Sequence, residues 1–381
     1  MSSAAGTVAG VPGDDSGFER IRAVADAILY EGYLLYPYRK SSPKNRVRWQ
    51  FGVLAPRAWA ERVGPVAESV AGSVESWRQH TECLVETRAD PAGVVLRARV
   101  RYLQLQAKRV ERRTADGGHE PVESLEYGGR PHLTFDEAVP REHDLVVTLA
   151  EILGGGRVFD VGAPGATDTE PLGDRGRVLR WRWPVAATAT LAAERLDAPV
   201  PAFRLSLTTA NTGSSAGPDT PRPEVLRHSL IAAHTLLRGE GLRFPSLIDP
   251  PAWAGSHARR CRNVHTFPVL AGDDAGPGTG TGMLSSPILL YDDPRVAPES
   301  PGDLHDAAEI DEILSLRTLT LTEDEKREAR ATDPRAAEIL DRVHGMPEEV
   351  LARLHGAVRS LRPDPTVPRE PTTNATDEGE T

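Results

Sequence analysis

Three potential metal ligands recur at intervals of four residues in the sequence HARRCRNVH. On one helix, His257, Cys261 and His265 would share a face, and imidazole and thiolate groups are the ligands that zinc prefers. The residues NVHTFPVL, which include His265, are instead typical of a strand, and no CxxC pair supplies a further ligand. The sequence therefore offers the three residues as candidates for a metal- or thiol-handling site. A buried cysteine without a metal is the alternative.

Two other patterns could bind ions. The glycines of GPGTGTG, residues 276–282, would let backbone amides approach a phosphate, but no Lys-Ser or Lys-Thr pair follows, which favours a flexible loop. The paired aspartates at 273–274 and 292–293 could hold a hard cation, although neighbouring side chains of an extended chain point apart. No GxSxG, HExxH or dinucleotide-binding motif is present. The sequence therefore predicts no cofactor and no catalytic residue.

Aromatic and cationic side chains are concentrated in LYEGYLLYPYRKSSPKNRVRWQ, residues 29–50. Tyrosine, tryptophan and arginine are enriched where proteins bind proteins, so one hypothesis is a partner-binding patch. Its residues are Tyr33, Tyr36, Tyr38, Arg39, Lys40, Lys44, Arg46, Arg48 and Trp49. The alternative is that the tyrosines pack a helix end onto a sheet, while the cations lie in water or pair with acidic helices near the C-terminus.

The whole chain has 381 residues and a formal net charge of −10. A nucleic acid or an anionic membrane surface would require a cationic field over much of the protein, so both are disfavoured as partners. The two cysteines, Cys83 and Cys261, are too few for a disulfide framework and favour a reducing, cytoplasmic compartment. The first residues lack the basic and apolar regions of a secretory signal, and no apolar run is long enough to span a membrane.

The elements that must position these residues follow from the spacing of apolar side chains. Residues 1–15 are small and polar, and we expect them to be disordered. Residues 16–81 should form an N-terminal unit, with an amphipathic helix followed by an extended segment that begins near Pro37.

Residues 82–270 have strand-like patterns. In VLRARVRY, residues 95–102, apolar side chains alternate with arginines, and the alternation changes phase at Tyr102–Leu103, which predicts a bulge or a second contact surface. Similar segments without a βαβ rhythm predict an α+β protein built on an antiparallel β-sandwich or a strongly bent sheet. An inserted helix is predicted near 223–238 from an apolar stripe. The stripe consists of Leu226, Leu230, Ala233 and Leu237.

The last quarter of the chain has a different composition. A loop rich in Gly, Asp and Pro is predicted over 271–302, and a series of short acidic helices over 303–362. Thr322 begins one helix with a capping box, and Asp333 caps another in which Pro334 is the first residue. The proline-rich residues 363–381 are expected to be a disordered tail.

Several segments resemble a family whose members are encoded beside actinobacterial-type high-affinity nickel-iron hydrogenases. They include ILYEGYLLYPYRKSSPKNRVRWQFGVL, TECLVE, AAHTLLR, SLIDPP and MLSSPILLYDDPRVAPESPGDLHDAAEIDEILSLRTLTLTEDEKREARATDPRA. The resemblance covers about residues 20–360 and implies a non-enzymatic accessory protein that helps to assemble, mature or organise a nickel-iron hydrogenase. Its partners would be hydrogenase subunits or maturation factors. A metal- or thiol-handling protein that uses Cys261 and nearby histidines remains the alternative.

Overall fold

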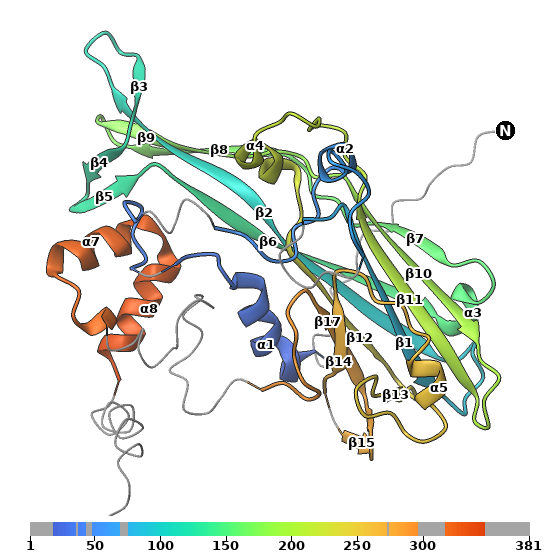
Figure 1. Cartoon of the computed structure of the whole chain (residues 1–381). Helices are drawn as coiled ribbons and strands as arrows, with labels where there is room; N and C mark the ends of the chain where they lie inside the picture. Colours follow the sequence, from blue (N-terminus) through green and yellow to red (C-terminus); the bar gives the residue numbers. More distant parts are fainter. Residues whose placement is uncertain are drawn as a thin grey trace, which may run out of the picture.

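The chain folds around antiparallel sheets, with one helix near its N-terminal end and short helices near its C-terminal end (Figure 1). The predicted α+β, sandwich-like fold is therefore confirmed. None of the described helices is long and apolar enough to cross a membrane. The computed structural model describes residues 18–35, 37–42, 48–68, 75–272, 274–295 and 317–346.

Two sheets form the centre of the molecule, and their strands pair antiparallel. The smaller sheet contains, in order, β1 (Arg78–Glu86), β11 (Ala202–Asn211), β10 (Ala187–Arg195) and β7 (Arg157–Asp160). The larger sheet contains, in order, β14 (Phe267–Leu270), β17 (Gly282–Ser286), β12 (Ile231–Gly239), β2 (Val95–Arg113), β9 (Gly176–Arg182) and β8 (Ala166–Leu172). Two more strands pair with β2, namely β3 (His119–Val122) and β6 (Phe135–Thr148).

The main core lies between the two sheets. Every second residue of β2, from Leu96 to Tyr102, is buried there against apolar side chains of β10 and β11, such as Leu191 and Leu205. The alternation in the sequence places these apolar residues on one face, because successive side chains of a strand point to opposite faces of the sheet. Burial of these rows is the main favourable contribution to the stability of the sandwich.

The phase change at Tyr102–Leu103 marks a second core, not a bulge in β2. The pairing of β2 with β6 keeps one register from Val95 to Lys108. Leu103 and Leu105 are buried on the opposite face of the sheet, in a separate cluster that includes Trp49. The register irregularity lies instead in the neighbouring β12, between Ile231 and His234.

The outer face of the larger sheet is covered by α1 (Glu19–Tyr30). Arginines of β2 lie beneath this helix. Arg101 is only 3% exposed and pairs with Glu142 at 2.8 Å and with Asp26 of α1. Arg99 pairs with Asp144 at 2.7 Å. These ion pairs allow the polar face of the strand to be buried, because each charge has a hydrogen-bonded partner.

Two helices follow near the C-terminal end, α7 (Glu323–Thr332) and α8 (Pro334–His344). The predicted capping box at Thr322 is confirmed, and Asp333 caps α8 by accepting a hydrogen bond from the Arg335 N–H at 2.9 Å. The other predicted acidic helices fall largely within residues outside the described ranges, as do the predicted disordered ends at 1–15 and 363–381.

The helix predicted near 223–238 is wrong for most of its length. Only α4 (Arg222–Val225) and the short 3-10 helix η2 (Leu226–His228) are helical, and β12 occupies the rest. Residues 231–237 are buried on both faces of the strand, so their apolar residues do not alternate. A strand buried on both faces can carry the same apolar stripe as a helix.

The loop predicted over 271–302 contains strands. β15 (Asp274–Gly276) and β16 (Thr279–Gly280) form a hairpin that pairs with β13 (Phe244–Pro245), and β17 enters the larger sheet. Gly276 and Gly278 have φ of 129° and 65°, which only glycine adopts at low cost. The glycines therefore build a tight turn.

The remaining elements are α2 (Arg57–Ala60), α3 (Leu149–Ile152), α5 (Gly255–Ala258), β4 (Ser124–Tyr127) and β5 (Arg130–Leu133).

Candidate functional site

The structure does not align the three candidate metal ligands on one helix. Because α5 ends at Ala258, Cys261 and His265 lie beyond it, and His265 has a φ of 57°. The Cys261 thiol donates to the carbonyl oxygen of His257 at 3.6 Å. Burial raises the pKa of Cys261 to about 11, so the thiol is protonated near neutral pH. Within the described ranges, no group of three or more His, Cys, Asp or Glu side chains is placed to hold a metal.

Four residues of the proposed partner-binding patch belong to the core. Tyr33, Tyr38, Arg48 and Trp49 are at most 6% exposed. The rings of Tyr33, Tyr38 and Trp49 pack in the second core, with buried side chains of β2 and α8. The interpretation of these four as an exposed patch is therefore wrong, because folding places them between the sheet and the C-terminal helices. Outside the described residues lie Tyr36, Lys44 and Arg46.

The two other patch residues contact their own chain. Arg39 lies 3.2 Å from Glu325 and 3.8 Å from Glu328, both in α7. The backbone N–H of Lys40 donates to the Thr332 hydroxyl at 3.0 Å, and its ammonium group pairs with Glu123. The alternative prediction, that the cations pair with acidic C-terminal helices, is thus confirmed for Arg39.

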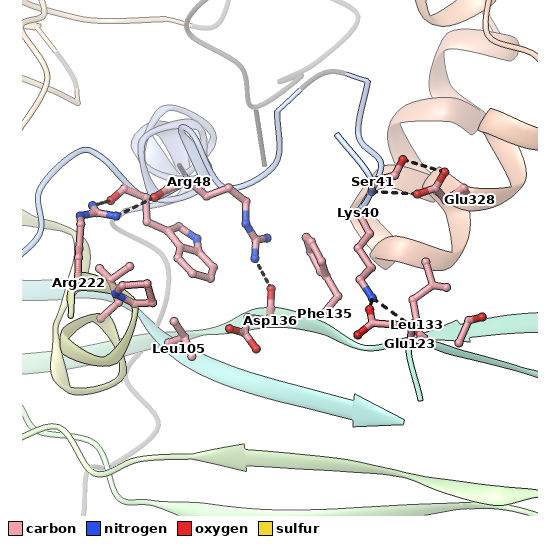
Figure 2. Close-up of a pocket in the computed structure, with 14 residues that line it drawn as sticks. Lys40, Ser41, Arg48, Leu105, Glu123, Leu133, Phe135, Asp136, Arg222 and Glu328 are labelled. Carbon is pink, nitrogen blue, oxygen red and sulfur yellow. Dashed lines mark hydrogen bonds and ion pairs between the residues drawn. The ribbon is translucent and has the colours of Figure 1, made fainter. Parts of the chain in front are cut away.

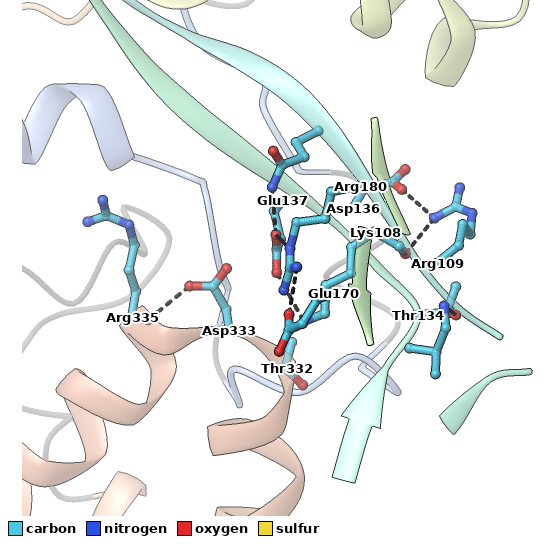
Figure 3. Close-up of polar contacts among 12 residues, drawn as sticks. Lys108, Arg109, Thr134, Asp136, Glu137, Glu170, Arg180, Thr332, Asp333 and Arg335 are labelled. Atoms are coloured by element: carbon cyan, nitrogen blue, oxygen red, sulfur yellow. Dashed lines mark hydrogen bonds and ion pairs between the residues drawn. The ribbon is translucent and has the colours of Figure 1, made fainter. Parts of the chain in front are cut away.

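A buried hydrogen-bond chain joins the same segments. The Tyr33 hydroxyl donates to Asp333 Oδ2 at 2.7 Å and accepts from the Ala138 N–H of β6 at 3.3 Å. Figure 3 shows Asp333 at the start of α8, beside Arg335. Burial raises the pKa of both the Tyr33 hydroxyl and the Asp333 carboxyl. These hydrogen bonds therefore link the N-terminal segment to the edge of the larger sheet and to α8.

A cavity of about 810 Å³ opens where these segments meet (Figure 2). Its volume is within the range of small-molecule sites, roughly 300–1,000 Å³. Side chains from the N-terminal segment, β2, β6, α4, η2 and α7 line it. The lining residues include Lys40, Arg48, Trp49, Leu105, Glu123, Leu133, Phe135, Asp136, Arg222, Leu226 and Glu328.

Arg48 is the most deeply buried charge in the cavity wall. It is 6% exposed, and its guanidinium carbon lies 4.2 Å from the centroid of the Trp49 ring and 4.0 Å from that of Phe135. It donates to the carbonyl oxygens of Tyr33, at 3.3 Å, and Asp136, at 2.5 Å. Burial lowers the pKa of Arg48, but an arginine remains charged at neutral pH. No carboxylate of the described residues is within ion-pair distance of this cation.

The other charges of the cavity wall have partners. Asp136 accepts from Arg109 at 2.7 Å (Figure 3), and Glu328 accepts from the Ser41 N–H at 3.0 Å and lies 3.8 Å from the Arg39 guanidinium. Arg222 pairs with Glu75 at 2.5 Å. Together with the pair between Lys40 and Glu123, these contacts leave Arg48, among the described residues of the wall, as the charge without an oppositely charged group at ion-pair distance, although the carboxylates of Asp136 and Asp333 are near enough to raise its pKa.

The opposite face of the same strands carries a continuous row of ion pairs. Lys108 of β2 lies 3.0 Å from Glu137 of β6, and Arg180 of β9 lies 3.5 Å from Glu137 and 2.8 Å from Glu170 of β8 (Figure 3). The residues next to Lys108 and Glu137 are Arg109 and Asp136, which point the other way. Because its charges are mutually compensated, this row is a structural feature of the sheet.

Two large apolar side chains are exposed in the segment that follows β17. Leu289 is 66% exposed and Tyr291 is 85% exposed. In contrast, Ile288, which precedes them, and Leu290, which lies between them, pack on the core under α1. Asp292 holds the segment in place, since its carboxylate accepts from the Leu270 N–H at 2.7 Å and from the Ser246 hydroxyl at 2.5 Å. The exposed pair is therefore displayed on a fixed backbone.

The sequence did not single out several of these residues. Phe135, Asp136 and Arg222 belong to no motif, and they lie far from Arg48 in the chain. Arg222 directly precedes the helix that the sequence predicts near 223–238, and nothing in its spacing links it to Arg48. No family model matches the sequence, and no curated protein is significantly similar to it.

Proposed function

We propose that this chain is a non-enzymatic accessory protein that helps to assemble, mature or organise a nickel-iron hydrogenase through protein-protein contacts. The partner would be a hydrogenase subunit or a maturation factor. The proposal rests on the sequence resemblance described above. One structural observation supports it, namely the exposed pair Leu289 and Tyr291, because the pair lies in the longest segment that carries the resemblance.

The exposed pair suits a protein partner for two physical reasons. Leucine and tyrosine side chains offer apolar area that gains free energy when a partner covers it, and tyrosine is enriched among the residues that dominate binding energies. The hydrogen bonds of Asp292 fix the backbone beforehand, so less conformational entropy is lost on binding. Scattered single apolar residues are ordinary on a protein surface, whereas Leu289 and Tyr291 are exposed only two positions apart, so that one partner can cover both.

The proposed setting is the cytoplasm, as the low cysteine content favours, and the net charge of −10 favours a protein over a nucleic acid. Arg48, Trp49 and Tyr33 are not part of the proposed contact surface, because their side chains are buried within the chain.

A pull-down from cells that express the hydrogenase tests this proposal. We expect the wild-type chain to recover hydrogenase subunits or maturation factors, and the double variant Leu289→Ser/Tyr291→Ser to recover at least about tenfold less, as the loss of one strong contact residue would cause. Val158→Ser is the matched control, since Val158 is 64% exposed on β7, in the other sheet. Recovery of neither partner by the wild-type chain, or undiminished recovery by the double variant, would contradict the proposal.

A further inference from the structure

We infer that the cavity beside Arg48 binds a small organic molecule that carries one carboxylate on a flat apolar ring. The carboxylate would bind Arg48, and the ring would contact the apolar part of the wall. This inference is independent of the proposed hydrogenase role. It rests on the charge balance of the cavity, on the shape and chemistry of its wall, and on an unsatisfied donor.

The charge balance favours one negative charge. Arg48 is buried with carbonyl oxygens and ring faces as its neighbours, while the carboxylates of the wall are paired with Arg109, Lys40 and Arg39. A buried charge without a counter-charge is costly, so an anion that pairs with Arg48 gains free energy. A second negative charge on the ligand would face Asp136, Glu123 and Glu328, which also line the cavity. A monoanion is therefore favoured over a phosphate monoester.

The rest of the wall favours a flat apolar body. Leu105, Leu133, Phe135 and Leu226 contribute apolar side chains, and Trp49 contributes an indole ring. Aromatic ligands gain from such surfaces through burial and ring contacts. A free inorganic anion would leave this apolar area unused.

An unsatisfied donor lies at the same place. The Trp49 Nε1 group is buried and has no hydrogen-bond acceptor among the described residues. An orphaned buried donor costs about 1–3 kcal/mol, and a carboxylate has a second oxygen that can accept from it. The Arg48 guanidinium carbon lies 4.2 Å from the centroid of the Trp49 ring, so both donors can serve one ligand group.

The backbone at this point is held in an uncommon conformation. Trp49 has a φ of 61°, a value that non-glycine residues rarely adopt. Arg222 fixes it by donating to the carbonyl oxygens of Trp49, at 2.7 Å, and Arg48, at 3.4 Å (Figure 2). Strained residues that the surroundings hold in place are concentrated at binding sites, where the strain orients side chains before the ligand arrives.

Isothermal titration of the full chain with two matched probes tests the inference. The probes are 2-naphthoate and its neutral analogue 2-naphthamide. We expect the naphthoate to bind the wild-type chain at least about tenfold more tightly than the amide, which corresponds to one modest charge interaction. Acetate, which lacks the ring, and 2-naphthyl phosphate, which carries more charge, should both bind more weakly than the naphthoate. Equal affinities for naphthoate and naphthamide would overturn the inference.

Two variants assign the preference to the site. Arg48→Gln should abolish the preference for naphthoate, while Arg204→Gln, in β11 of the other sheet, should leave it unchanged. Circular dichroism checks that each variant is folded. If Arg48→Gln does not fold, Trp49→Phe decides the question, because it keeps an aromatic ring at this position and removes the indole N–H together with the smaller ring that carries it. Trp49→Phe should weaken the binding of both probes through the smaller ring, and should weaken naphthoate binding several-fold more than naphthamide binding through the lost N–H. A preference that survives in Arg48→Gln, or naphthoate binding that is unaffected in Trp49→Phe, would contradict the assignment.

Discussion

Arg48 and Tyr33 show how residues typical of an interface can be used inside one chain. Arg48 lies between two aromatic rings, and Tyr33 donates to Asp333, a residue far along the sequence. Tyrosine and arginine combine apolar surface with hydrogen-bonding groups, which suits a contact between segments of one chain as well as a contact between proteins. The composition of residues 29–50 therefore predicts a contact but not whether the contact is internal.

His234 makes a testable contribution to the pH dependence of stability. It is completely buried in β12, and its pKa is lowered to about 3, first by burial and then by the charge of Arg101. The unfolded chain therefore binds more protons than the folded chain once the pH falls below about 6.5, the ordinary histidine value. The stability that comes from neutral His234 is present above that pH. It is lost as the pH falls from there towards 3.

The measurement is the free energy of unfolding in urea at several pH values between 7 and 4. We expect the wild-type chain to lose up to about 1.4 kcal/mol per pH unit more than His234→Asn over this range, because the variant lacks the titrating group. The control is His119→Asn, an exposed residue of β3, which should follow the wild-type chain. Identical pH dependences for wild type and His234→Asn would refute this explanation.

At the scale of elements, β2 is the strand that organises the molecule. Its first half contributes to the sandwich core on one face, and its second half contributes Leu103 and Leu105 to a second core on the other face. The sequence predicted this strand and its change of phase, because both depend on the local spacing of apolar residues. The sequence could not separate β12 from a helix, because a strand buried on both faces loses the alternation that identifies strands.

The docking of α8 can be tested at the same scale. Ile339 of α8 is 1% exposed in the second core, so Ile339→Ala removes buried apolar atoms and should cost about 2–5 kcal/mol of local stability. We expect faster amide hydrogen exchange in α7 and α8, with little change in β10 and β11. Glu338→Ala, an exposed neighbour on the same helix, is the control and should leave exchange unchanged. Faster exchange throughout the sandwich would show that α8 is not a separable docking element.

At the scale of the whole molecule, the sandwich is a platform on which distant segments meet. The Arg48 cavity combines residues at positions 40–41, 48–49, 105, 123–124, 133–136, 222–226 and 328. No local pattern encodes such a combination, since it depends on the twist of the larger sheet and on the docking of α7 and α8 against the N-terminal segment. The α+β class was predictable because alternation, capping and turn residues act over a few neighbours. The site was not, because its parts come together only in the folded chain.

The central claim is that Arg48 is a buried cation placed to receive an anion. A crystal structure of the chain in the presence of 2-naphthoate would test it most directly. We expect the carboxylate about 3 Å from the Arg48 guanidinium, with the naphthyl ring against Phe135 and Leu105. A cavity that stays empty at a naphthoate concentration that saturates binding in solution, or a naphthoate bound elsewhere with Arg48 unchanged, would contradict the claim.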